Sequence, residues 1–282
     1  MTKLLQIPFE RKEPVDLNVV SYDGQIFITN DPDIELRRRN QELSGLEPKT
    51  AEFRQKCEYS GYKFEQLVTI PTPWVQASRK QITSRHKTPV NNYEQFISVV
   101  TSKIGLVRTL LAGEVDCVWN YVPDASSDKK DDILLHYVEL KTSKLVQTPG
   151  NVLTMERKLF KTWAQCFLLG IKKVVYGFRD DLMILRNVEL YETDEIPVFL
   201  KNSTVATGTK KINAMSALKW YGAVLEFIKS EVPLDGNGAW KLNYDPGSGT
   251  FNLDEIIDPK PVRDRIITAE FREWRESLKN GV

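Results

Sequence analysis

Two β-rich segments joined by a polar connection constrain the fold of this chain more than any other feature. Residues 113–119 and 134–140 alternate in character as strands with one buried face do. The connection at 124–132 is polar and of low complexity, so we expect the two segments to pair as a hairpin with a flexible tip. A helix is expected next, over 154–169, because apolar residues recur there at helical spacing and Gly170 stands at the capping position.

The rest of the chain mixes strands and helices without a clean βαβ rhythm. The other expected elements are strands at 24–28, 96–100, 174–178 and 183–190, helices at 49–58, 215–230 and 262–278, and loops at 75–89 and 235–249. This mixture favours the α+β class. No segment has the composition of a linker, so we expect a single domain over residues 1–282.

Composition excludes few function classes. Apolar residues make up 41% and charged residues 27% of the 282, and a net charge of +1 argues neither for nor against a polyanionic partner. Cys57, Cys117 and Cys166 are widely spaced without a CxxC pair, so free thiols are expected rather than a zinc site or disulfides. No apolar run approaches the ~18 residues of a membrane span, and no secretory signal is recognisable. We therefore expect an intracellular protein without a membrane partner.

Charged residues stand two apart in both expected strands. Side chains alternate faces along a strand, so Glu114 and Asp116 share one face, as do Glu139 and Lys141. If the strands pair, three carboxylates and one ammonium converge. Carboxylates this close need a neutralising cation, and oxygen ligands without a Cys or His cluster favour Mg²⁺ or Mn²⁺. A lysine beside such an ion can orient or deprotonate a water and stabilise charge on a phosphate oxygen, as in PD-(D/E)xK nucleases.

The pattern is weak by itself, because alternating charges are common on solvated strands. On those four residues alone, solvated strand faces remain the better-supported explanation. The context favours a site, because Glu139 and Lys141 lie at the end of the apolar run 133–140. Gln165 is flanked by apolar or small residues on the expected helix, and Glu65 lies in an aromatic stretch, so both side chains can face inward.

Four motifs, taken in order, resemble a known family. They are Gly61-Tyr62-Lys63-Phe64-Glu65, Gly113-Glu114-Val115-Asp116-Cys117, Tyr137-Val138-Glu139-Leu140-Lys141-Thr142 and Phe160-Lys161-Thr162-Trp163-Ala164-Gln165. Over about residues 15–190 the chain resembles the DXO family of eukaryotic RNA decapping nucleases. That family includes a nuclear protein that accompanies and activates a 5′–3′ exoribonuclease.

The resemblance implies two β-sheets flanked by helices, with a divalent metal site in the cleft between them. It implies hydrolysis at RNA 5′ ends: pyrophosphate release, removal of incomplete, mature or NAD caps as a unit, or 5′–3′ degradation of monophosphate RNA. By position, the resemblance implies these roles: metal ligands at Glu65, Glu114, Asp116, Glu139 and the carbonyl of Leu140; catalysis by Lys141, Gln165 and Glu139; and substrate contacts from Glu65, Lys141 and Gln165.

One family feature is not matched. The family usually carries an arginine motif well upstream of the region that matches residues 14–17, and Arg11 stands too close to that region to serve. Two explanations stay open. Either the chain is truncated, or it belongs to a branch of the family without this motif, a description that the cytoplasmic fungal branch fits. Either way, pyrophosphate release is the activity we least expect, and a cytoplasmic location is preferred to a nuclear one.

Three functions remain as alternatives. The first is a Mg²⁺- or Mn²⁺-dependent decapping nuclease and 5′–3′ exoribonuclease. The second is a weakly catalytic or inactive partner that activates a larger 5′–3′ exoribonuclease, although an inert scaffold has no need of clustered carboxylates. The third is a PD-(D/E)xK DNA endonuclease.

Overall fold

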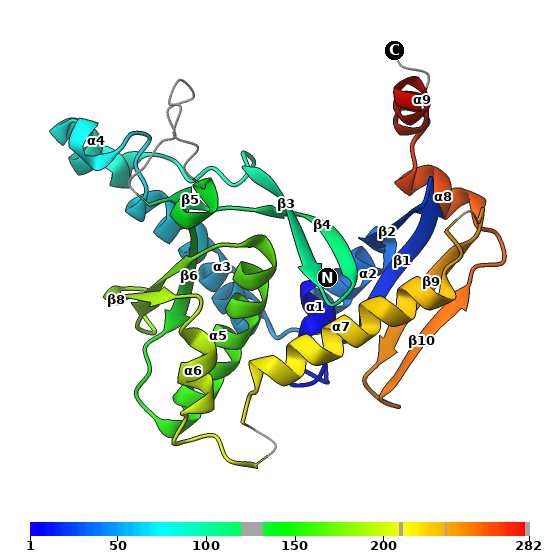
Figure 1. Ribbon diagram of the computed structural model, residues 1–282. Helices are drawn as coiled ribbons and strands as arrows, with labels where there is room; N and C mark the ends of the chain where they lie inside the picture. The colour runs from blue at the N-terminus through cyan, green and yellow to red at the C-terminus, as the bar shows by residue number, and fades with distance from the viewer. Residues whose placement is uncertain (120–131, 209–210, 235, 280–282) are drawn as a thin grey trace. The chain divides into compact units, whose positions relative to one another are not determined.

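The computed structural model describes residues 1–119, 132–208, 211–234 and 236–279 of the chain (Figure 1). These residues form two compact units. Unit 1 joins Lys3–Leu46 to Ser216–Val282, and unit 2 is Glu47–Met215. Two compact units can belong to one domain, so the single domain over 1–282 stays a prediction.

Unit 1 is built on a four-stranded antiparallel sheet in the order β10-β9-β1-β2. The inner strand β1 carries buried apolar side chains, among them Leu17 and Val19, because helices and neighbouring strands enclose it. The indole N–H of Trp220 donates to the carbonyl of Leu4 at 3.0 Å, which ties α1 to α7. The elements are α1 (Thr2–Gln6), β1 (Val15–Tyr22), β2 (Gln25–Asn30), α2 (Pro32–Ser44), α7 (Ala214–Glu231), β9 (Ala239–Asp245), β10 (Thr250–Glu255), α8 (Lys260–Ile266) and α9 (Ala269–Lys279).

Two expectations for the end of the chain are wrong. The Gly-rich region 235–249 was expected to be a loop, but it contains β9, which pairs with β1 and places Ala239 and Leu242 in the core. The single helix expected over 262–278 is two helices. The break comes at Ile267, whose backbone leaves helical geometry while its side chain is buried, and the Thr268 hydroxyl then caps the start of α9.

Unit 2 combines a four-stranded sheet, β5-β6-β7-β8, with a separate hairpin, β3-β4. Strands β6 and β7 are parallel and connected through α5, which makes one β-α-β unit that we did not expect from the sequence. The sequence does not indicate this unit, because the strand pairs on either side of β6-β7 are antiparallel and break the βαβ rhythm. The elements are α3 (Pro48–Val68), the 3₁₀ turn η1 (Trp74–Gln76), α4 (Arg79–Ser84), η2 (Arg85–Lys87), β3 (Ile97–Ile104), β4 (Val107–Glu114), β5 (Cys117–Val118), η3 (Ile133–His136), β6 (Tyr137–Lys144), α5 (Pro149–Leu169), β7 (Lys173–Arg179), β8 (Leu185–Glu192) and α6 (Ile196–Lys201).

Helices α3 and α5 cover opposite faces of the β6-β7 pair. Phe64 of α3 packs with Val138 and Leu140 of β6, whereas Gln165 of α5 is bonded to Glu139. Because successive strand residues point to opposite faces, the two helices lie on either side of β6. The close approach of α3 requires Gly177, where an added Cβ would lie 2.6 Å from the Phe64 ring.

Local structure near the expected hairpin differs from the prediction in one important respect. Residues 113–119 are not one strand: β4 ends at Glu114, and β5 begins at Cys117 in a different sheet. Glu114 and Asp116 therefore do not share a strand face. The antiparallel pairing of β5 with β6 is confirmed, with Cys117 opposite Val138. The polar tip at 124–132 lies outside the described residues, apart from Asp132.

Other segments also carry more structure than expected. The helix predicted over 49–58 extends to Val68, so it includes the motif that ends at Glu65. The segment 75–89, expected to be a loop, holds α4 and two 3₁₀ turns. The α+β class with helices flanking the sheets is confirmed, and Cys57, Cys117 and Cys166 are free thiols as expected.

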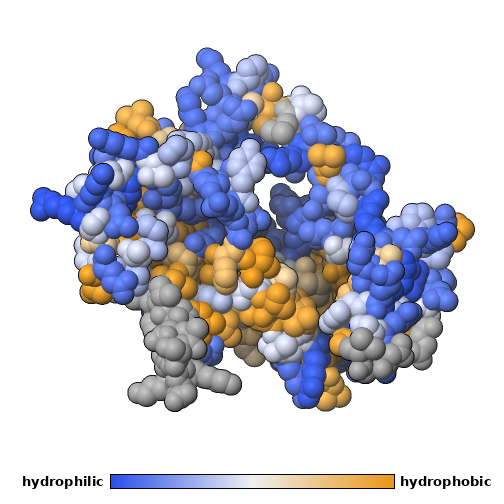
Figure 2. Space-filling model, turned by 90° about the horizontal axis from the view of Figure 1, so that it is seen from above, coloured by the Kyte–Doolittle hydropathy of each residue, from blue (hydrophilic) through white to orange (hydrophobic). Residues whose placement is uncertain are grey.

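Hydrophilic residues cover most of the surface seen in Figure 2, and hydrophobic residues are exposed there in smaller patches. In the described part of the chain, none of the helices combines the length and the apolar character that crossing a bilayer requires.

Candidate active site

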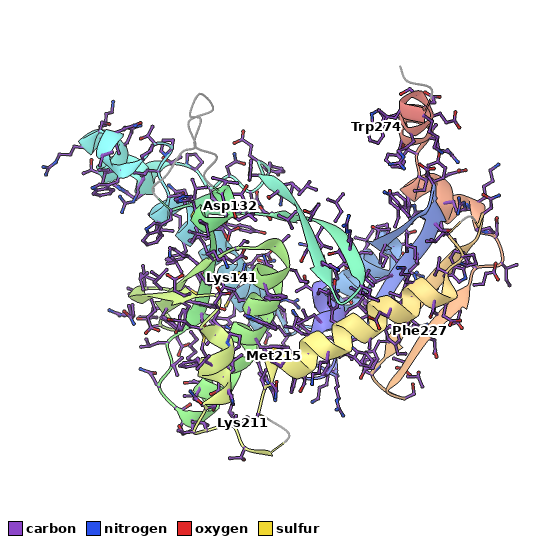
Figure 3. The ribbon with its side chains drawn as sticks, viewed as in Figure 1. Asp132, Lys141, Lys211, Met215, Phe227 and Trp274 are labelled. Carbon is purple, nitrogen blue, oxygen red and sulfur yellow. The ribbon has the colours of Figure 1, made fainter. Side chains whose placement is uncertain are left out.

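The residues singled out in the sequence lie on four elements of unit 2 and on one short connection. Figure 3 places Lys141 on β6, beside α5. The full set is Glu65 in the last turn of α3, Glu114 at the end of β4, Asp116 between β4 and β5, Glu139, Leu140 and Lys141 on β6, and Gln165 on α5.

The electrostatics of Glu65 show that the charged members converge. Burial, together with the neighbouring charge of Asp116, raises the pKa of this carboxyl to about 7. Lys141 acts in the opposite direction, and Glu114 and Glu139 add smaller raising effects. All four groups are therefore within electrostatic reach of one carboxyl. The expected convergence exists, although the chain achieves it without placing Glu114 and Asp116 on one strand face.

Asp116 is held against the edge of β6. Its carboxylate accepts a hydrogen bond of 2.6 Å from the backbone N–H of Leu140. The carbonyl of a strand residue points to the same edge as its N–H, so the Leu140 carbonyl faces the Asp116 side of β6. Burial raises the pKa of Asp116, while Lys141 and the Leu140 N–H oppose that shift. A backbone carbonyl and a carboxylate thus lie together at this edge.

Glu139 is the most deeply buried member of the cluster, with 1% of its surface exposed. Its Oε1 accepts hydrogen bonds from Gln165 Nε2, at 2.7 Å, and from Lys141 Nζ. Its Oε2 is buried and has no hydrogen-bond partner among the described residues. Burial is the main reason why the pKa of Glu139 is raised to about 7; Lys141 opposes the rise and the charge of Asp116 contributes to it. A buried carboxylate oxygen without a partner costs free energy, so this oxygen is a strong candidate ligand for a cation.

Lys141 remains an ammonium in this environment. Burial by itself would lower its pKa, but Glu139 and then Asp116 outweigh burial and raise the pKa above the ordinary value. The side chain is 35% exposed, so its charge can also reach a substrate. Lys141 can therefore stabilise negative charge and donate hydrogen bonds. The sequence also allowed it to deprotonate a water, which an ammonium cannot do.

The donor set fits a hard divalent cation. Carboxylate oxygens from Asp116, Glu139 and Glu65, with the Leu140 carbonyl, are the kind of ligand that Mg²⁺ and Mn²⁺ take. A divalent ion would also stabilise the ionised carboxylates against the burial and mutual repulsion that raise these pKa values. No three acidic, His or Cys side chains in the described residues already have the spacing of an ion-binding group, so side-chain rotations must accompany binding.

Glu114 occupies the exposed edge of the cluster. Its Oε2 accepts a hydrogen bond of 3.3 Å from Gln95, a residue that the sequence did not suggest. Hairpin register explains the contact, because Ile97 lies opposite Glu114 and Gln95 precedes that pair. Only the β3-β4 register could have identified Gln95 in advance. The roles assigned to the individual site residues stay predictions.

Comparison with known proteins gives consistent matches. A family model described as "RAI1 like PD-(D/E)XK nuclease" matches residues 1–272. The curated decapping nuclease RAI1 of Debaryomyces hansenii is 55% identical over 99% of this chain and 71% of that protein. The crystal structure of Candida albicans Rai1 in complex with pU5-Mn²⁺ has a TM-score of 0.92 and 44% identity, covering 98% of this chain and 73% of that one. The Scheffersomyces stipitis Rai1 structure with (3′-NADP)⁺ and calcium has a TM-score of 0.89 and 50% identity, covering 98% and 72%.

Proposed function

The chain belongs to the RAI1-like family of PD-(D/E)XK nucleases, whose curated members are decapping nucleases, and on that premise we propose how its own site acts. The chain is an enzyme of the decapping nuclease class, acting on phosphodiester bonds at RNA 5′ ends. We infer that the reaction takes place at the cluster around Glu139.

One observation supports this assignment above the others. Glu139 is buried, yet one of its oxygens is held by Lys141 and Gln165 while the other has no partner among the described residues. A charge on a merely structural strand would be solvated or fully paired. This carboxylate is oriented by two donors and leaves one oxygen for a further ligand. That is the arrangement a metal-binding carboxylate needs.

A divalent cation, Mg²⁺ or Mn²⁺, is proposed as the cofactor. The family's relative from C. albicans was crystallised with pU5 and Mn²⁺. When bound, such an ion polarises a phosphoryl oxygen and lowers the pKa of a coordinated water. The residues proposed to hold it are Glu65, Asp116, Glu139 and the Leu140 carbonyl, with Glu114 at the exposed side.

The remaining roles follow from the protein's own groups. Lys141 presents an ammonium on the same strand face as Glu139, so it can stabilise charge that develops on a phosphate oxygen. Gln165 holds Glu139 Oε1 through its amide N–H₂ and keeps an amide oxygen that can orient an attacking water. Glu65 is half-buried within electrostatic reach of Asp116 and Lys141, where it can face both ion and substrate.

The assignment is tested with E139A and the isosteric E139Q, assayed on 5′-end-labelled RNAs with Mn²⁺. The panel carries triphosphate, unmethylated-cap, methylated-cap, NAD or monophosphate ends. Both variants are expected to lose at least about a hundredfold in kcat on every substrate that the native chain cleaves. An exposed glutamate such as Glu226, changed to Gln, is the control. Native activity in E139Q with metal still required would refute the assignment.

The preferred 5′ end is a further proposal. A relative was crystallised with (3′-NADP)⁺ and calcium, which supports dinucleotide-like 5′ ends, including NAD caps, as substrates of this chain. We propose removal of such caps as a unit together with 5′–3′ degradation of monophosphate RNA. The triphosphate member of the panel tests whether this chain also releases pyrophosphate.

Two further proposals concern the cellular setting. We propose that the chain binds a 5′–3′ exoribonuclease, as expected from the family, and sedimentation of the purified pair tests it. Failure to co-sediment at micromolar concentration would count against it. A cytoplasmic location is proposed ahead of a nuclear one, and imaging of a fluorescent fusion decides between them.

Matched RNA and DNA single strands in the cleavage assay exclude or support the DNA endonuclease alternative.

A further inference from the structure

A cationic segment is bonded to the end of α3 that carries Glu65. Between Gln66 and Tyr93 the sequence contains no Asp or Glu, but it contains four Lys or Arg residues and a histidine. In the structure these residues belong to α4 and η2, at the outer edge of unit 2 in Figure 1. The cationic segment is defined by Arg79, Lys80, Arg85, His86 and Lys87.

Two side chains of α3 fix this segment next to Glu65. Lys63 Nζ donates to the carbonyl of His86 at 3.0 Å, and Gln66 Nε2 donates to the carbonyl of Arg85. Lys63 stands two residues before Glu65 in the chain, and Gln66 directly follows it. The position of the cationic segment is therefore coupled to the helix turn that supplies a proposed metal ligand.

The charges of the cationic segment are available to a ligand. Arg79, Lys80 and Lys87 are exposed, and none forms an ion pair with a residue that the structure describes. Basic side chains elsewhere in unit 2 do pair, for example Lys144 with Asp181 at 2.8 Å. Three unpaired cations on an acid-free stretch maintain a positive field, which attracts a polyanion.

We propose that the cationic segment binds the phosphodiester backbone of the RNA chain downstream of the 5′ end undergoing cleavage. This inference rests on the proposed function, because the reacting end must lie at the Glu139 cluster. The segment has unpaired point charges at its surface, which suits sequence-independent contact with phosphates. Its anchoring to the turn of Glu65 places it where a strand leaving the site can reach it.

The proposal predicts an effect that depends on substrate length. A substrate too short to leave the site cannot touch the cationic segment, whereas a long RNA can. Removing charge from the segment should therefore weaken binding of long RNA and leave short RNA unaffected. It should also reduce the salt dependence of long-RNA binding, because each lost phosphate contact lowers the slope of log K against log salt by about 0.7.

The experiment compares R79A/K80A/K87A with K219A/K229A/K260A, a control that removes three exposed lysines from unit 1. Both are made in the full chain, in native and E139Q backgrounds. Fluorescence anisotropy in the E139Q background measures binding of 5′-monophosphate RNAs of about 4 and about 25 nucleotides across a salt series. Thermal melting confirms that both triple variants keep their fold, and single variants replace a triple that does not.

The expected result is about tenfold or greater loss of affinity for the long RNA in R79A/K80A/K87A, with a salt slope smaller by about 2. The short RNA and the control variant are expected to show no such change. Cleavage in the native background should lose kcat/KM on the long RNA only. Equal losses on both lengths, equal losses in the control, or unchanged RNA binding with loss of binding to an exoribonuclease would each overturn the proposal. Loss of the proposed function itself would appear separately, as cleavage that survives E139Q.

Discussion

Gln165 on α5 donates a hydrogen bond of 2.7 Å to Oε1 of Glu139 on β6, and this contact links the covering helix to the proposed metal ligand. Lys141 binds the same oxygen, so two donors fix one side of the carboxylate. The opposite oxygen has no partner among the described residues. The geometry assigns Gln165 a positioning role through Glu139, in addition to any direct contact with water.

Q165A is expected to lower metal affinity and kcat by roughly 10- to 100-fold, because Glu139 would lose one of two orienting donors. Mn²⁺ titration of the cleavage rate measures both effects. An exposed glutamine, Gln25 changed to Ala, serves as the control. If Gln165 acted only on the substrate, KM would rise while the Mn²⁺ midpoint stayed unchanged. That result would contradict the positioning role.

D116N separates the charge of Asp116 from its hydrogen bond. The Asn side-chain oxygen can still accept from the Leu140 N–H, so the edge of β6 should keep its structure. The charge is lost, so we expect at least about tenfold weaker Mn²⁺ binding and a comparable loss of kcat/KM. The metal-free variant should melt no lower than the native chain, because burial already disfavours the carboxylate. A lower melting temperature with unchanged Mn²⁺ affinity would contradict this role.

The sequence predicted which charged residues converge better than it predicted the local structure around them. Glu139, Lys141 and Asp116 were identified from spacing and motif order, and they do converge. The reason given for their convergence was partly wrong, because 113–119 was treated as one strand. A change of sheet between β4 and β5 depends on long-range pairing, which spacing within one segment does not report.

The missed elements share a physical cause. β9 lies in a Gly- and Asn-rich region, and its strand character depends on pairing with β1, more than two hundred residues earlier in the sequence. The β-α-β unit and the extension of α3 likewise depend on packing, as in the contact of Phe64 with Gly177. Helix α5 was predicted well because its own periodicity and its Gly170 cap mark it locally.

The raised pKa values of Glu65 and Glu139, both about 7, predict a pH dependence for the metal-free chain. The folded protein holds protons more tightly than the unfolded chain, where glutamate titrates at about 4.3. The unfolding free energy should therefore fall as pH rises from about 4.5 to 7 and level off above. Saturating Mn²⁺ should remove this decline, because the ion favours the ionised carboxylates. Urea unfolding at several pH values, with EDTA or Mn²⁺, measures both curves, and a metal-free stability that increases over this interval would contradict the cluster.

G177A tests whether the position of Glu65 depends on packing behind it. A Cβ at residue 177 would lie 2.6 Å from the ring of Phe64, the neighbour of Glu65 on α3. Ring and helix must move, so we expect a loss of about 1–3 kcal/mol in stability. We also expect weaker Mn²⁺ binding, since Glu65 would shift with α3. G150A is the matched control, because its Cβ meets nothing closer than 3.8 Å and alanine is the better helix former. Denaturant unfolding and Mn²⁺ titration are measured on both variants at one pH. Destabilisation of G177A with native metal affinity would show that α3 adjusts without moving Glu65, and would separate the core packing of α3 from its role in the site.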